Sequence, residues 1–164
     1  MMMTRGTDAH GGNSADFEEL IATDLNCFKP KSRKQYTYWN IFFSLEGVPM
    51  MFQHHPPMYP SKLPWMKNQS ALRMAAKLTM TYAGKPKAPK LAVYSHVHRK
   101  SDSENAYPIR VITTPAFCLQ TSFIHRIGAD AVSDIGALLI SCEKGSYEIR
   151  HFCTEFSEET WVNL

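Results

Sequence analysis

The stretch YTYWNIFFSLEG, residues 36–47, decides the fold of this chain. Large or β-branched side chains recur in it at every second position: Thr37, Trp39, Ile41, Phe43 and Leu45. This period of two is typical of a strand with one buried face, and Gly47 and Pro49 are expected to stop it. The pattern therefore predicts a strand whose core face includes Trp39 and Phe43.

The segment that follows, residues 48–65, is rich in proline. Its five prolines are Pro49, Pro56, Pro57, Pro60 and Pro64. Proline fixes φ and has no N–H group to donate, so it opposes both a helix and a central strand and favours an extended polyproline backbone. We therefore predict a long loop from Val48 to Trp65.

Beyond the loop, helical and strand patterns alternate. A stripe of small residues ending at Gly84 predicts a helix within residues 67–84, and a short helix is expected within residues 14–25. Further elements are expected as strands at 91–98, 109–115 and 116–127, a helical turn at 128–136, and a hairpin at 137–156. The predicted fold class is α+β, a mostly antiparallel sheet of five or six strands with one main helix and a long Pro-rich loop.

The composition indicates one folded domain. With 164 residues and 44% apolar side chains, the chain has enough material for a core. Residues 1–24 are acidic and poor in apolar groups, so we expect a flexible N-terminal segment followed by a single domain at 25–164. No run of about 18 apolar residues is present, and the N-terminus lacks the apolar region of a secretory signal. A cytosolic protein is expected.

Positive charge is concentrated in the middle of the chain. Residues 25–100 hold 13 Lys and Arg and one acidic residue, whereas residues 101–164 hold 4 basic and 9 acidic residues. Basic surfaces attract the phosphate groups of nucleic acids and of anionic lipids. We predict that such a contact is formed by Lys29, Lys31, Arg33, Lys34, Lys85, Lys87, Lys90, Arg99 and Lys100.

No local motif indicates catalysis. The chain contains no GxGxxG, GxSxG or HExxH sequence, and its four cysteines lack the paired spacing of a zinc site. His96 and His98 would share a strand face and could bind a metal with a third ligand elsewhere, but solvated histidines are commoner. His54 and His55 are assigned to the Pro-rich loop. We therefore predict no catalytic residue, no metal and no cofactor, and a protein that is not an enzyme.

The loop contains PPMY, residues 56–59, which fits the PPxY pattern. Such peptides bind WW domains as polyproline helices, a role that would fall on Pro56, Pro57 and Tyr59. A rival use of the same loop is self-association, in which an apolar arm enters a neighbouring subunit through Met50, Met51, Phe52 and Met58. In a third interpretation, Tyr59 packs against the body of the domain. The sequence leaves these uses open.

A small basic chain with a PPxY motif, an acidic N-terminus, an antiparallel sheet and no catalytic motif resembles the matrix proteins of rhabdoviruses. Its length is similar to that of the plant-infecting cytorhabdovirus branch, and the likeness is one of organisation over residues 25–160. In the animal-virus members, PPxY recruits host ubiquitin ligases that carry WW domains. Two features depart from the family: here PPxY follows the first strand, and the N-terminus is acidic rather than lysine-rich.

The resemblance implies a non-enzymatic structural protein of the virion. Such a protein self-associates into a layer and links the viral nucleocapsid to anionic lipids at the inner face of a host membrane during assembly and budding. The family's phospholipid and nucleocapsid contacts would fall on Lys29, Lys31, Arg33 and Lys34. The alternative is a viral RNA-binding accessory protein of the host cytoplasm, a silencing suppressor or a regulator, with bases stacked on aromatic residues beside the basic segment.

Overall fold

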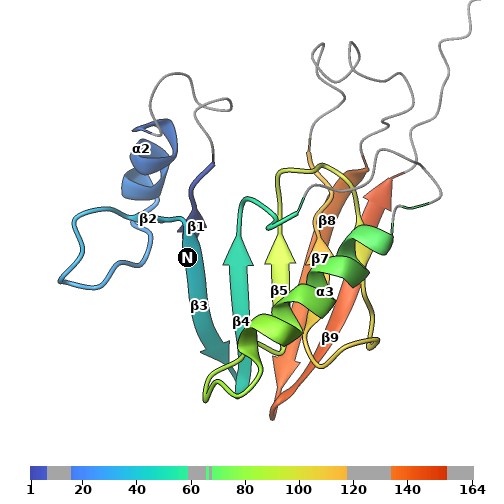
Figure 1. Cartoon of the computed structure of the whole chain (residues 1–164). Helices are drawn as coiled ribbons and strands as arrows, with labels where there is room; N and C mark the ends of the chain where they lie inside the picture. The colour runs from blue at the N-terminus through green and yellow to red at the C-terminus, as the bar shows by residue number, and fades with distance from the viewer. Residues whose placement is uncertain (7–15, 59–65, 67, 118–133, 155–164) are drawn as a thin grey trace, which may run out of the picture.

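A five-stranded sheet lies between one helix and a two-stranded hairpin (Figure 1). The computed structural model describes residues 1–6, 16–58, 66, 68–117 and 134–154. Within them the helices are α2 (Asp16–Asp24) and α3 (Gln69–Tyr82). The strands are β1 (Met3–Thr4), β2 (Thr37–Tyr38), β3 (Asn40–Leu45), β4 (Val48–Gln53), β5 (Leu91–Tyr94), β6 (Ser101–Asp102), β7 (Arg110–Thr113), β8 (Ile135–Glu143) and β9 (Ser146–Thr154).

The central sheet has the strand order β3-β4-β5-β7-β6. The pairs β3–β4 and β6–β7 are antiparallel, whereas β4–β5 and β5–β7 are parallel. Parallel neighbours need a crossover connection, and α3 lies in the one between β4 and β5. The α+β class with one main helix is therefore confirmed, and the sheet is mixed because two parallel pairs lie at its centre.

The prediction of a loop that begins at Val48 is wrong, because Val48–Gln53 forms β4, an interior strand of the sheet. One proline of the segment, Pro49, falls in this strand, opposite Ser44 of β3. Pairing with β5 begins one residue later, at Met50, so the missing N–H group of Pro49 leaves no ladder bond open. The Pro49 carbonyl still accepts a hydrogen bond from the Lys90 N–H group at 2.8 Å.

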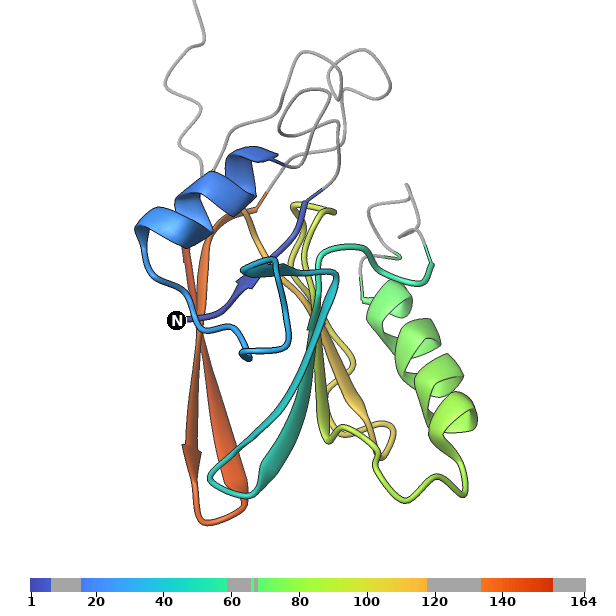
Figure 2. The same cartoon turned by 90° about the vertical axis from the view of Figure 1, so that its left-hand side faces the viewer.

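Both faces of the sheet are covered, so the molecule has three layers (Figure 2). On one face, Met51 and Tyr94 pack against α3, which contributes Ala71, Met74, Ala75 and Leu78. On the other face, Met50 and Val93 pack against the β8–β9 hairpin through Leu138, Ile140, Cys142, Tyr147 and Ile149. A strand that is buried on both faces reads as a continuous apolar run, which explains the sequence LAVY of β5.

The expectation that Trp39 lies in the core is wrong. The predicted alternation holds for Ile41, which is buried, and for Phe43, which is half buried, but Trp39 is 54% exposed and Leu45 is also exposed. The strand is interrupted at Trp39, between β2 and β3, so the period of two does not run through it. The indole ring instead stacks with Arg5, whose Cζ lies 5.1 Å from the ring centroid.

The other local predictions are largely confirmed. The two predicted helices are α2 and α3, the predicted hairpin is β8–β9, and two of the predicted strands are β5 and β7. Tyr59 and most of the predicted strand at 116–127 and of the predicted turn at 128–136 lie outside the described residues. Among the described helices, neither has the length and apolar content needed to cross a membrane.

Two tight turns meet at one end of the molecule. Glu46 and Gly47 join β3 to β4, and Lys144 and Gly145 join β8 to β9; all four have a positive φ, as a type I′ turn requires. The Gly145 N–H group donates to the Glu46 carbonyl at 2.6 Å, and the Lys90 ammonium donates to the Gly145 carbonyl at 3.3 Å. These bonds fix the hairpin against the sheet.

Glu19 of α2 connects the N-terminal part to β2. Its carboxylate accepts hydrogen bonds from the Tyr36 and Thr37 N–H groups and from the Thr37 hydroxyl, the last at 2.6 Å. Burial raises the pKa of Glu19, but these bonds outweigh burial and hold the pKa below its ordinary value. Since β1 also pairs with β2, residues 1–6 and 16–24 are joined to the rest of the fold.

Candidate metal centre

Three histidines meet where the parallel strands of the sheet end. Gln53 closes β4 and pairs with Tyr94, which closes β5. The residues that follow are therefore neighbours at one edge of the sheet: His54 and His55 after β4, and His96 after β5. The carboxyl edge of parallel strands is the usual place for ligand sites in sheets crossed by helices.

The three side chains are close enough to bind one ion. One ligand nitrogen from each of His54, His55 and His96 lies within 4.8 Å of the others. The closest two are His54 Nε2 and His96 Nδ1, which are 3.1 Å apart. The His55 ring lies beside the His96 ring with a centroid separation of 4.2 Å. All three side chains are half buried, so the cluster is accessible from outside without being fully solvated.

The separation of the closest pair fits a shared metal ion. Two imidazole nitrogens bound to one ion at about 2.1 Å, with an angle of about 95–110° between them, lie about 3.1–3.4 Å apart. The observed 3.1 Å between His54 and His96 falls in this range. A set of three imidazoles suits first-row transition ions such as zinc, whereas magnesium and calcium prefer oxygen ligands. The cluster could therefore hold a zinc-like ion with open positions for water.

The backbone at this edge is held by hydrogen bonds. The Ser95 N–H group donates to the Gln53 carbonyl at 3.2 Å, which joins the ends of β4 and β5. On the other side of β5, the Thr114 N–H group donates to the Tyr94 carbonyl at 2.8 Å, and the Thr114 hydroxyl donates to Ser95 Oγ at 3.3 Å. The histidines thus project from a braced edge, which limits how far they can move apart.

The chain between β5 and β6 leaves the sheet at His96. His96 and His98 both have positive φ, 70° and 52°, so they do not share the face of a strand as the sequence predicted. Asp134 fixes this segment, because its N–H group donates to the His98 carbonyl at 2.9 Å and its carboxylate accepts from the Lys100 N–H group at 2.6 Å. The turn brings His96 toward His54 and His55 rather than toward His98.

Sequence reasoning missed this cluster because it paired His96 with the wrong histidine. The signal was present in two places, HH directly after the apolar run 48–53 and SH directly after the apolar run 91–94. Recognising it requires that β4 and β5 be adjacent and parallel, so that their carboxyl ends coincide. Assigning residues 48–53 to a loop removed that possibility.

The residues predicted to form a binding arm lie in different places. Met50 and Met51 are buried on opposite faces of β4, and Phe52 is half buried, so these three cannot leave the fold as an arm without removing a central strand. Pro56 is half buried, Pro57 is exposed, and Met58 packs against the core on the α3 side. Tyr59 lies outside the described residues.

The predicted basic residues are split among three segments. Lys29 and Arg33 stack on Tyr36 and Tyr38, at 4.3 Å and 4.2 Å from the ring centroids, while Lys31 and Lys34 are exposed. Lys85, Lys87 and Lys90 precede β5, whereas Arg99 and Lys100 follow it, so these two groups lie at opposite ends of that strand. The described basic residues therefore do not form one continuous patch.

Comparison with known proteins adds little. No family model matches the chain, and no curated protein matches it. Two solved structures are similar, a single mutant of Vps29 from Entamoeba histolytica (TM-score 0.44, 8% identity) and vacuolar protein sorting 29 from Cryptosporidium parvum (TM-score 0.39, 11% identity). Each match covers 79% of this chain, and 68% and 64% of the respective structures. A likeness at this level carries no argument about the function of this chain.

Proposed function

We propose that this protein binds a divalent transition-metal ion through His54, His55 and His96. The observation that carries the proposal is the convergence of three imidazoles, within 4.8 Å of one another, at the carboxyl ends of two adjacent parallel strands. The two closest rings, those of His54 and His96, are hydrogen-bonded to each other at 3.1 Å, which holds them at a separation that also suits a shared ion. Here two strands and a turn with positive φ are needed to bring them together.

Such a site has the composition of a hydrolytic centre. An ion held by three histidines keeps a position for water and lowers the pKa of that water toward about 7, which makes a nucleophile available at neutral pH. The hydroxyls of Ser95 and Thr114 lie at the same edge, and Arg99 and Lys100 follow in the same segment. The positive charge of a bound ion would itself favour an anionic substrate such as an ester of phosphate. This proposal departs from the sequence-based prediction of a protein without a metal.

The proposal is tested by titrating the purified, chelator-treated protein with Co²⁺ and with Zn²⁺. We expect one ion bound per chain and a cobalt absorption band typical of nitrogen ligands. The double variant His54→Ala, His96→Ala should weaken binding at least about 100-fold, because it removes two direct ligands, and losing even a group that only orients a ligand typically costs about 10–100-fold in affinity. His151→Gln, which changes a histidine of β9 outside the cluster, is the matched control and should bind as the wild type does.

Hydrolysis is measured on the same samples with bis(4-nitrophenyl) phosphate. The metal-loaded wild type and His151→Gln should release nitrophenol, whereas the double variant should not. Equal metal binding by the wild type and the double variant would show that the ion is held elsewhere. Metal binding without hydrolysis would leave a metal site and remove the catalytic part of the proposal.

A second candidate function, that of a viral matrix protein, is favoured by apolar side chains exposed beside the first basic segment. Lys31 and Lys34 are exposed there, and four large apolar residues lie nearby in the sequence with more than half of their surface exposed: Phe17, Leu20, Leu25 and Phe28. Apolar surface next to positive charge marks contacts with membranes or with other proteins. In this proposal the N-terminal part binds anionic lipid and the protein forms a layer between a membrane and a nucleocapsid.

The membrane contact is tested by co-sedimentation with phosphatidylserine vesicles at physiological salt. The variant Lys29→Ala, Lys31→Ala, Lys34→Ala should bind on the order of 100-fold more weakly, because each basic residue near an anionic surface contributes about 1 kcal/mol. Arg33 is kept because its guanidinium donates to the Thr37 carbonyl at 2.8 Å. Arg73→Ala, Lys77→Ala, at exposed positions of α3 outside the predicted basic contact, is the control. Unchanged sedimentation of the triple variant would rule out this contact.

A further inference from the structure

The two edges of the central sheet differ in how they are protected. At one edge β6 has two residues, and its Asp102 is paired with Arg110. At the other edge β3 has six residues, NIFFSL, with no charge and no proline, and Phe42 is 58% exposed. Natural edge strands are usually short, charged or interrupted by proline, because an unprotected edge pairs with another strand. β3 has none of these protections.

The outer side of β3 presents unpaired backbone groups. The two-residue turn closes β3–β4 with a hydrogen-bonded pair, and every second pair after it is also hydrogen-bonded. The residues in between, Asn40, Phe42 and Ser44, therefore direct their N–H and C=O groups away from β4. Figure 2 looks onto this side and shows the half of β3 nearest the turn uncovered by other described segments. An added strand would find its bonding partners there.

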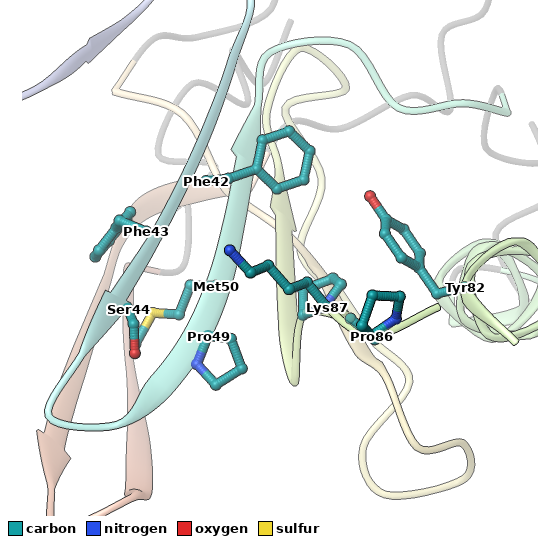
Figure 3. Close-up of a pocket in the computed structure, with 10 residues that line it drawn as sticks. Phe42, Phe43, Ser44, Pro49, Met50, Tyr82, Pro86 and Lys87 are labelled. Carbon is teal, nitrogen blue, oxygen red and sulfur yellow. The ribbon is translucent and has the colours of Figure 1, made fainter. Parts of the chain in front are cut away.

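An apolar groove adjoins the same edge on the side of α3 (Figure 3). Its volume is about 480 Å³, and Phe42 forms one wall. The opposite wall comes from the end of α3 and the segment that follows it, with Tyr82, Pro86, Lys87, Ala88 and Pro89. Among the described residues, no acidic side chain lines the groove, and the one charged lining residue is Lys87. A side chain that lies beside Phe42 on a neighbouring strand would cover apolar surface here.

We propose that two copies of this chain pair through β3, antiparallel about a two-fold axis at Phe42, so that their two sheets become one. In this register the two Phe42 residues form backbone hydrogen bonds with each other, and their side chains lie side by side on the face that carries the groove. Asn40 of each copy is paired with Ser44 of the other. The strand is uncharged, so two copies meet at the axis without like-charge repulsion. A partner strand with a charged side chain opposite Phe42 would lose the hydration of that charge against an apolar ring, which costs free energy. A second copy of β3 has no such cost.

The histidine cluster stays open in this dimer. It lies at the carboxyl ends of β4 and β5, whereas the pairing uses the lateral edge of β3. The dimer is therefore independent of the proposed metal, and measurements with and without a chelator distinguish strand pairing from metal bridging.

The test is sedimentation equilibrium and light scattering of the wild type at about 1–100 μM, in the presence of EDTA. We expect a dimer, and we expect Phe42→Lys to be monomeric throughout, with dimerisation weakened at least about 100-fold because two like charges would meet on the axis of the interface. Met80→Lys is the matched control: Met80 is 79% exposed on α3, so the same change of side-chain class should leave the dimer intact.

Ser44→Pro tests the same strand contact if Phe42→Lys does not fold. Ser44→Pro removes an outward N–H group and leaves the bonds to β4 in place, so it should also give a folded monomer with a cooperative thermal transition. A wild type that is monomeric at 100 μM would overturn the inference, and so would a folded Phe42→Lys or Ser44→Pro variant that remains dimeric. A dimer that dissociates only when EDTA is added would assign the association to metal bridging and would equally overturn it.

Discussion

Asp102 is the residue through which three strands are joined. Its carboxylate accepts hydrogen bonds from Arg110 Nε at 2.9 Å and Nη2 at 2.7 Å, and its Oδ2 lies 3.8 Å from His151 Nε2 in β9. Burial raises the pKa of Asp102, but the bonds from Arg110 and from the Glu104 N–H group outweigh burial and hold the pKa below its ordinary value of 3.8. Burial lowers the pKa of His151, with Lys100 adding to the effect, so this ring approaches Asp102 in its neutral form.

Asp102→Asn should lower the free energy of unfolding at pH 7 by about 3 kcal/mol, because Arg110 would lose its charged partner at a site that is largely buried. The folded-state pKa of Asp102 is depressed, so its contribution is present above pH 3.8 and is lost as the pH falls through the folded value. Urea melts from pH 7 to pH 2 should therefore show the two proteins converging in acid. Parallel curves over the whole range would contradict this assignment.

Among the described glycines, Gly136 occupies a position where the backbone leaves no room for a side chain. Gly136 in β8 has a φ of 154°, and a Cβ atom there would overlap the Phe152 carbonyl oxygen in β9. Gly84 after α3 also has a positive φ, 72°, but open space surrounds it. Gly84 therefore shows the effect of a positive φ where no overlap is added.

Gly136→Ala should destabilise the protein by about 1–3 kcal/mol from strain, because its φ lies in a region used almost only by glycine, and by a further 1–3 kcal/mol, approximately, from overlap with β9. Gly84→Ala is the matched control and should cost about 1 kcal/mol, because only the strain applies. The free energies of unfolding from urea melts give both values. Equal losses in the two variants would show that the β8–β9 hairpin adjusts without cost.

At the scale of the whole molecule, the three layers keep the proposed metal site and the proposed dimer contact apart. The helix and the hairpin cover the two faces of the sheet, so binding is left to its edges (Figure 1). The carboxyl edge carries the histidine cluster, and the lateral edge at β3 carries the proposed dimer contact. Both edges are held in place by β4, which lies between β3 and β5 and supplies two of the three histidines at its end.

The sequence by itself determined the elements whose signal is local. The helix at Gln69–Tyr82 follows from small residues at helical spacing and from Gly84, and the hairpin of β8 and β9 follows from alternation on both sides of Lys144 and Gly145. Because local patterns indicate the type of an element and its approximate extent, the α+β class could be predicted as well. The same patterns misplaced Trp39, since they do not show where a strand is interrupted.

Only the tertiary structure decided which strands are neighbours and in which direction they run. Pro49 opposes a central strand by local rules, yet β4 tolerates it because pairing with β5 starts one residue later. The parallel pairing of β4 with β5 depends on the path of α3 across the sheet, a property that no short segment encodes. That pairing brings His54, His55 and His96 together from positions more than 40 residues apart, as the contact between His54 and His96 shows. The candidate site is thus a product of topology, because its ligands are adjacent only in the folded chain.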